Sequence, residues 1–351
     1  LGFGPKVRVI VGGLYPRGHG AEGGGYGYIR VLEKFIKAYP DKVKVFTDTQ
    51  AVKLIKNESG KVIGVVGKHD GKDVNFMASK GVIIATGGFG SNVEMRQAKN
   101  TGVWKEVTLD KNIPCTNNFK ASQGDGLKLA EQVGANVINL DDIQLHPGGT
   151  PKTGIMSSWP SGRNRIFLTP QGDRFVNEDA ARDTLCKAIF KEGGKYWIVS
   201  NHVKYPTLDY QSKNLTIGEM IKLGQAFSGN TIEELAQKTG MDPKKLRASI
   251  DTYNDVVTGK IKEDNLGFKK FTQDDKPMTE GPFYATPMVP AVHHTMGGIQ
   301  INSAAQVLDK NGQVIPGLFA AGEVTGGVRV GGNGIADAMV FGRVSGQTAL
   351  K

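Results

Sequence analysis

The chain of 351 residues contains 39% hydrophobic and 22% charged residues and carries a formal net charge of +10. No segment reaches the roughly 20 consecutive apolar residues of a membrane-spanning helix, and the scattered basic residues argue against a nucleic-acid interface. Cys115 and Cys186 lie in no C-x-x-C or metal spacing, so we expect neither a disulfide framework nor a metal site.

Short apolar runs and glycine-rich turns alternate over the first 90 residues. We expect a helix at 28–39, which ends before Pro40, and strands at 7–12, 43–46, 50–57, 61–67, 73–78 and 81–85. The last of these strands runs directly into Thr86, Gly87 and Gly88. This order is typical of a dinucleotide-binding domain, in which the carboxyl ends of the strands face the ligand.

The middle of the chain has a different pattern. After a helix at 124–134, we expect a hairpin at 165–177 and a strand at 196–199. Thr231 and Asp242 are typical N-caps of two further helices, and Pro243 suits the first position of the second one. We therefore expect an inserted α+β domain at 146–292, between two parts of a first domain at 1–145 and 293–351.

The C-terminal residues combine histidines and an arginine with many glycines. Glycine lets a backbone approach a flat or phosphorylated cofactor closely, because no Cβ intervenes. His293 and Arg329 are residue types that hold an anion. A helix expected at 333–346 has an N-terminus that stabilises negative charge. Together these residues predict a flavin with an anionic substrate laid against it.

Several motifs carry a resemblance to a known family. The chain resembles the flavoprotein subunits of the fumarate reductase/succinate dehydrogenase superfamily, most closely the soluble reductases of fumarate, urocanate and acrylate-type acids. The matching motifs are His146-Pro147, the run from Gly172 to Asp183, HHTMGG at 293–298, GEVTGG at 322–327 and RVGGN at 329–333. The resemblance spans nearly the whole chain. It implies an α/β fold with an FAD-binding domain, an inserted α+β capping domain, and an active site between them.

The resemblance also implies a reaction. Non-covalently bound FAD would pass a hydride from N5 to the C=C bond of an α,β-unsaturated carboxylic acid, and Arg182 would deliver the proton. On its chemistry alone, a guanidinium stays charged in proteins and is first a carboxylate clamp. The implied catalytic residues are Arg182, His293, Arg329 and His146, and the implied substrate-binding residues are His146, Ser157, Ser158, His293 and Arg329.

The implied FAD contacts come from four parts of the chain. They are Thr86, Gly87, Gly88, Asp125, His294, Gly322, Glu323, Gly332, Asn333, Gly334 and Ile335. The expected partners are a small carboxylate substrate and an electron donor, a haem or FMN domain or protein, because the chain has no C-x-x-C-H haem motif.

The chain departs from the family pattern where fumarate reducers hold the second carboxylate. Those relatives carry a Thr-Glu pair and then an arginine, whereas Ser157, Ser158 and Ser161 stand here. Arg163, Arg165 and Glu178 are the candidates to complete the proton relay instead. Trp159 makes this end more apolar, which favours a monocarboxylic enoate over fumarate.

A second departure is the missing dinucleotide-binding loop. No G-x-G-x-x-G follows an opening strand, so we expect a further segment or chain to complete the FAD site. Two alternatives stay open. One is another dehydrogenase of the superfamily, of the ketosteroid type, against which the His293–Arg329 anion pair argues. The other is a non-catalytic flavin-binding fragment. The sequence leaves the cellular compartment undetermined.

Overall fold

The computed structural model describes residues 2, 7, 18–116, 121–156, 163–212, 215–270, 272–327 and 334–351. Its contacts group the chain into two units, each of which is described by itself. Unit 1 comprises 1–88, 124–140 and 296–351, and unit 2 comprises 89–123 and 141–295. This grouping is geometric, so the division into an FAD-binding domain at 1–145 and 293–351 and a capping domain at 146–292 stays a prediction.

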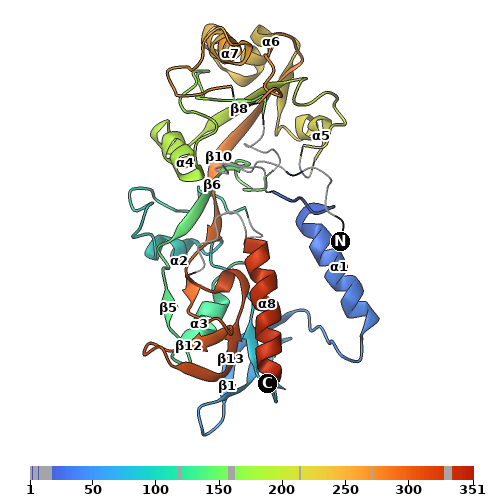
Figure 1. Cartoon of the computed structure of the whole chain (residues 1–351), viewed down its shortest axis with the longest axis vertical. Coiled ribbons are helices and arrows are strands. Elements are labelled where there is room, and N and C mark those ends of the chain that lie inside the picture. Colours follow the sequence, from blue (N-terminus) through green and yellow to red (C-terminus); the bar gives the residue numbers. More distant parts are fainter. Residues whose placement is uncertain are drawn as a thin grey trace. The chain divides into compact units, whose positions relative to one another are not determined.

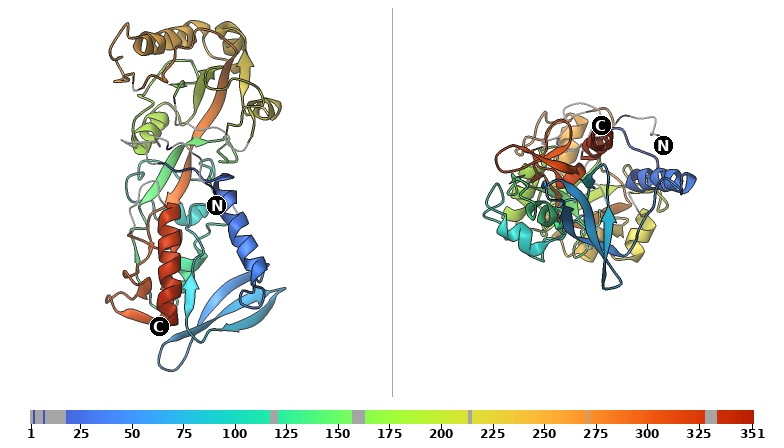
Figure 2. Two further views of the ribbon diagram at one scale, coloured as in Figure 1. Left: turned by 45° about the vertical axis from the view of Figure 1, so that its right-hand side comes forward. Right: turned by 90° about the horizontal axis from the view of Figure 1, so that it is seen from below.

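Unit 1 contains small sheets. An antiparallel meander is formed by β1 (Thr49–Lys56), β2 (Val62–His69) and β3 (Lys72–Met77), as the sequence predicts (Figure 2, left, blue strands at the foot of the view). In a second sheet, β13 (Val314–Ala320) lies between β12 (Gln306–Leu308) and β4 (Val82–Ile84), and β13 pairs with β4 in parallel. A short third sheet joins β5 (Val137–Ile138) to β11 (Gly298–Ile299).

The helices of unit 1 are α1 (Gly24–Ala38), α3 (Asp125–Glu131), the 3₁₀ helix η1 (Gly322–Val324) and α8 (Gly334–Leu350). Helix α1 starts four residues before the expected 28, after a left-handed Gly23. The expected strand at 43–46 is wrong: these residues form no ladder, and Val45 and Phe46 are exposed. A run of high β-propensity forms a strand only where a neighbouring strand accepts its hydrogen bonds.

Unit 2 is built on one sheet. Its order is β6-β10-β8-β7, with β9 also paired to β10. The strands are β6 (Ile143–Gly149), β7 (Ile166–Leu168), β8 (Tyr196–Asn201), β9 (Phe227–Gly229) and β10 (Phe283–Thr295). The helices are α2 (Val93–Ala98), α4 (Arg182–Lys191), α5 (Ile217–Lys222), α6 (Ile232–Thr239) and α7 (Pro243–Thr258).

The core of unit 2 lies between this sheet and two helices. Helices α6 and α7 pack against each other, α6 also against β9 and β10 and α7 against β7 (Figure 1). Their N-caps are those the sequence predicts, because the side chains of Thr231 and Asp242 accept backbone N–H bonds from Glu234 and Lys244. The bridge between Leu168 and Arg174 closes the expected hairpin. Among the helices in the described ranges, none is long and apolar enough to cross a membrane.

Candidate functional site

The pairing of β6 with β10 brings two predicted site residues together. The strands are antiparallel, with His146 opposite Ala291 and Gln144 opposite His294. The ring centroids of His146 and His293 lie 5.0 Å apart, and the residue His146 is only 1% exposed. Residues that lie far apart in sequence therefore form one histidine pair at the end of this sheet.

His293 occupies an irregular position in β10. Val292 pairs with Leu145, and His294 pairs with the next residue of β6, Gln144, so His293 is the extra residue of a β-bulge. A bulge interrupts the alternation of side chains and redirects the one that it adds. The Nδ1 atom of His293 lies 2.6 Å from the hydroxyl oxygen of Thr116.

A backbone hydrogen bond indicates the tautomer of His146. The N–H of Gly148 donates to Nδ1 of His146 over 3.0 Å. Because a backbone amide only donates, Nδ1 accepts, and the ring hydrogen is inferred to sit on Nε2 of a neutral imidazole. His146 is therefore arranged to offer one N–H donor, from Nε2.

Arg182 is the first residue of α4 and is tied to the same sheet. Its Nη1 donates to Oε1 of Gln144 over 3.1 Å, while its buried Nε finds no acceptor among the described residues. Burial lowers the pKa of Arg182, against the opposing effects of Cys186 and Asp183. A buried donor without an acceptor is rare and points to a group that completes the site.

Gln144 is a site residue that the sequence analysis missed. It precedes His146 by two positions, and residues at i and i+2 of a strand face the same side. This spacing is the signal that could have identified it. Thr116 was missed as well, and its local sequence gives no comparable signal.

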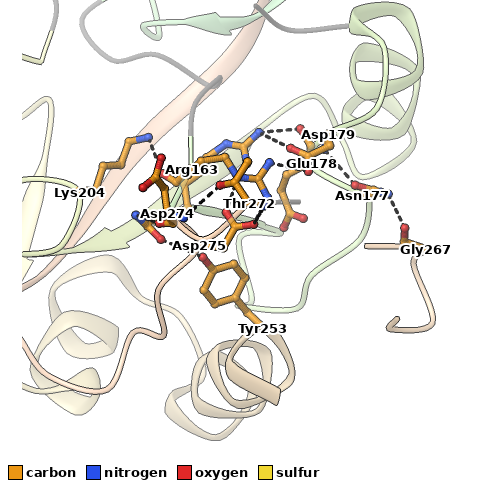
Figure 3. A network of polar contacts seen from close by, with 12 residues as sticks. Arg163, Asn177, Glu178, Asp179, Lys204, Tyr253, Gly267, Thr272, Asp274 and Asp275 are labelled. Atoms are coloured by element: carbon orange, nitrogen blue, oxygen red, sulfur yellow. Dashed lines mark hydrogen bonds and ion pairs between the residues drawn. The ribbon is translucent and has the colours of Figure 1, made fainter. Parts of the chain in front are cut away.

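A network of ion pairs, buried at Glu178 and Arg174 and partly exposed at Asp179, holds the chain just before Arg182 (Figure 3). Glu178 pairs with Arg174 at 2.7 Å, and its carbonyl accepts from Arg165 at 2.8 Å. Asp179 bridges Arg163 at 2.8 Å and Arg165 at 3.2 Å. The three expected relay residues, Arg163, Arg165 and Glu178, are thus members of this network, and their part in a proton relay stays a prediction.

In unit 1, the expected FAD contacts gather at the carboxyl ends of β4 and β13. Beyond these strands, Ala321 donates its N–H to the carbonyl of Ile84, and Gly124 donates to Gly88. Gly87 and Gly322 have φ angles of 74° and 78°, which favour glycine. Carboxyl ends of parallel strands are where such sheets bind ligands.

Close backbone packing shapes this end of unit 1. A Cβ on Gly126, in the first turn of α3, would stand 2.1 Å from the hydroxyl of Thr86. Asp125 begins the same helix, and Glu323 lies in η1, which contacts α8. Gly334 and Ile335 form the first turn of α8, where backbone N–H groups are available to an anion. These features fit a phosphorylated, flat cofactor such as FAD.

The remaining expected contacts divide between the other unit and the undescribed residues. His294 follows the bulge in β10 of unit 2, and its Nδ1 is buried without a partner in the described structure. Ser157, Ser158, Arg329, Gly332 and Asn333 lie outside the described residues. The strand expected at 7–12 falls almost wholly outside them too. The assignments of individual site residues therefore stay predictions.

Several known proteins are similar to this chain in sequence and fold. A model of the FAD binding domain family matches residues 11–335. NADH:acrylate oxidoreductase of Vibrio harveyi is 36% identical over 98% of this chain and 34% of that protein. Urocanate reductase of Eggerthella lenta is 34% identical over 97% of this chain and 55% of that protein. The open conformation of a flavocytochrome c3 fumarate reductase matches with a TM-score of 0.74 and 33% identity, over 95% of this chain and 57% of that one.

The chain spans between about a third and somewhat more than half of the length of these relatives. The likeness covers nearly all of this chain at more than 30% identity. It confirms the resemblance inferred from the motifs and the α/β FAD-binding fold. The chain belongs to the FAD binding domain family and is a homologue of flavin-dependent fumarate, urocanate and acrylate reductases.

Proposed function

We propose that the chain is the flavin- and substrate-binding part of an FAD-dependent reductase of α,β-unsaturated carboxylic acids. The observation that carries this proposal is the pairing of β6 with β10, which sets the rings of His146 and His293 5.0 Å apart. Gln144, on the same strand as His146, holds Arg182 nearby. The activities named for the relatives, on acrylate, urocanate and fumarate, support the same class of reaction.

The histidine pair suits a carboxylate group. When bound and reduced, FAD would supply the hydride for the β-carbon of the enoate. Negative charge then grows on the carboxylate side, where His293 and Arg329 would stabilise it as preorganised donors. His146, with its hydrogen on Nε2, would add a neutral donor to the substrate.

Arg182 is the proposed proton donor to the α-carbon. Burial lowers the pKa of Arg182, which makes its guanidinium a better acid than one in water. The unpartnered Nε gives the side chain a donor that the described residues do not use. Arg163, Arg165 and Glu178 are the proposed members of the relay that returns a proton to it.

The proposed substrate is a monocarboxylic enoate. Ser157 and Ser158 replace the residues that hold a second carboxylate in fumarate reducers, and Trp159 adds an apolar surface. Fumarate is accordingly the weaker substrate in this proposal, and a substrate with an apolar or aromatic tail is the stronger one.

We propose two polypeptide partners, an electron donor with haem or FMN and a strand–turn–helix segment that completes unit 1. The second is supported by β4, which pairs with β13 on one side and stands at the end of its sheet in the described structure. Ile83 in this strand is 41% exposed, although its run of apolar residues predicts burial. A parallel strand added beside β4 would cover it.

Rapid mixing of the reduced, FAD-loaded protein with fumarate, urocanate, acrylate and cinnamate tests the reaction. We expect at least one monocarboxylic enoate to reoxidise the flavin faster than fumarate does. Flavin that stays reduced with every enoate would overturn the proposal. In that case a visible absorption spectrum with bound FAD would favour the alternative of a non-catalytic flavin-binding fragment.

A further inference from the structure

The segment that ends in Thr116 runs beside the bulged end of β10. The N–H of Val292 donates to the carbonyl of Pro114 over 2.9 Å, and the N–H of Thr116 donates to the carbonyl of Val292 over 2.8 Å. Cys115 and Val292 form a parallel bridge between these two bonds. The backbone of Thr116 is therefore set in register with the residue that precedes His293.

Gly154 and Arg96 hold this segment in place. Gly154 lies against it so closely that a Cβ there would stand 2.2 Å from the carbonyl oxygen of Cys115. The guanidinium of Arg96, a residue only 2% exposed, donates to the carbonyls of Gly90 at 3.0 Å and of Leu109 at 2.8 Å. It also donates to the carbonyls of Asp110 and Ile113, and so organises the turn that leads into Thr116.

The orientation of the His293 ring depends on contacts from outside the strand ladder. As the extra residue of the bulge, it is passed over in the register of β10 with β6, so the strand ladder alone does not set its direction. The hydroxyl of Thr116 meets Nδ1 of His293 at 2.6 Å. With Nδ1 turned toward Thr116, the ring presents Nε2 on its opposite edge.

We propose that Thr116 is a positioning residue, which orients the His293 ring through this hydrogen bond so that Nε2 meets the substrate carboxylate. The proposal rests on the enoate-reductase function proposed above. Thr116 would act through His293 and would not touch the reacting atoms. Its hydroxyl gives His293 the fixed orientation that the backbone gives His146 through Gly148.

Imidazole ¹⁵N NMR tests the contact without any turnover. The chain has six histidines, and His293→Gln identifies the signals of His293. Thr116→Val removes the hydroxyl at nearly constant shape, and Thr116→Ser retains it. We expect the valine variant to shift the Nδ1 signal of His293 and the serine variant to leave it close to wild type. His69 and His202, which contact other elements, serve as internal references. An unmoved His293 signal in the valine variant would overturn the proposal, whatever the activity.

Kinetics with an enoate test the consequence. A hydrogen bond that orients a substrate-binding side chain contributes enough that its loss should raise KM about tenfold, with kcat changed less than about threefold. Thr116→Ser should restore wild-type KM. A shifted His293 signal with unchanged KM would refute the positioning role. If the signal shifts but no enoate oxidises the reduced flavin even in wild type, the proposed function fails while the Thr116–His293 contact stands.

Discussion

Unit 1 and unit 2 bury their apolar side chains to different degrees. In unit 2, α6 and α7 close over the sheet, and residues such as Leu235 and Ile250 are fully buried. In unit 1, α1 and α8 leave large apolar side chains in water: Phe35 is 59% and Met339 is 60% exposed. Such apolar helix faces are normally packed against another element or a partner. Unit 2 thus buries a core between its sheet and its helices, whereas unit 1 exposes more large apolar side chains than unit 2 in the described part of the chain.

The largest expected effect is a loss of activity without a loss of FAD. It would come from a substitution in unit 2, which holds the proposed proton donor, whereas unit 1 holds most of the expected FAD contacts. We expect Arg182→Gln to lower kcat with an enoate on the order of 10³-fold, because it removes the proposed proton donor. Its FAD content should stay at the wild-type level, since most expected contacts of FAD lie in unit 1. Steady-state rates and the flavin absorbance per protein give both quantities. Lys187→Gln, exposed on the same helix, is the control. Equal loss of FAD and activity would contradict the separation.

The closed interior of unit 2 should be sensitive to the loss of one charge. Arg174 is paired with the buried carboxylates of Glu178 and Asp264. Arg174→Met leaves both carboxylates unpaired, so we expect the free energy of unfolding to fall by about 3–5 kcal/mol. The matched control is Arg247→Met, which breaks an exposed pair with Glu233 and should change stability little. Urea unfolding measures both, and equal effects would contradict the difference in burial.

Substitution of an exposed apolar residue should show whether a further segment binds over α8 of unit 1. Met339 in unit 1 and Leu223 in unit 2 are both 60% exposed. If a further segment covers α8, Met339→Glu removes an apolar contact worth about 1.5 kcal/mol or more and weakens FAD retention about tenfold. Leu223→Glu should leave FAD retention unchanged. Equal FAD retention by the two variants, measured by dialysis, would show that nothing binds over α8.

The smallest expected effect is a pH dependence of stability that comes from Lys204, a partly buried cation in unit 2. Burial and the nearby Arg165 and Arg163 lower the pKa of Lys204 to about 7. The charged form is thus penalised in the folded state, so stability should rise as the pH increases from about 7 toward the ordinary lysine pKa. Between pH 7 and 9 we expect a gain on the order of 1 kcal/mol, because part of the side chain stays exposed. Unfolding curves of Lys204→Met should lack this gain, and those of Lys260→Met should keep it.

The sequence predicts those elements of the fold that depend on neighbouring residues. The β-meander of β1–β3, the caps at Thr231 and Asp242, and the strand leading to Gly87 and Gly88 all follow from local spacing. The strand at 43–46 failed, because a ladder needs a partner strand that no local pattern reveals.

The motifs also single out His146, His293 and Arg182 as candidate site residues, but not the side chains that contact them. Thr116 contacts a residue 177 positions away, and Gln144 accepts from one 38 positions away. Such contacts depend on which strands pair and in which register. The sequence around a threonine or a glutamine does not indicate which distant residue its side chain contacts.

The bulge in β10 makes the geometry of this strand depend on the number of its residues. Directly before and after His293, successive residues of β10 face opposite sides of the sheet, and the extra residue shifts this alternation by one position. Deletion of one residue at this point would remove this bulge, while the register shift between Val289 and Ala291 would remain. It would also remove the position at which the His293 side chain is redirected, while leaving His294 opposite Gln144 and the composition of the strand almost unchanged. Among homologues, the length of this strand is therefore as informative as the identity of its histidines.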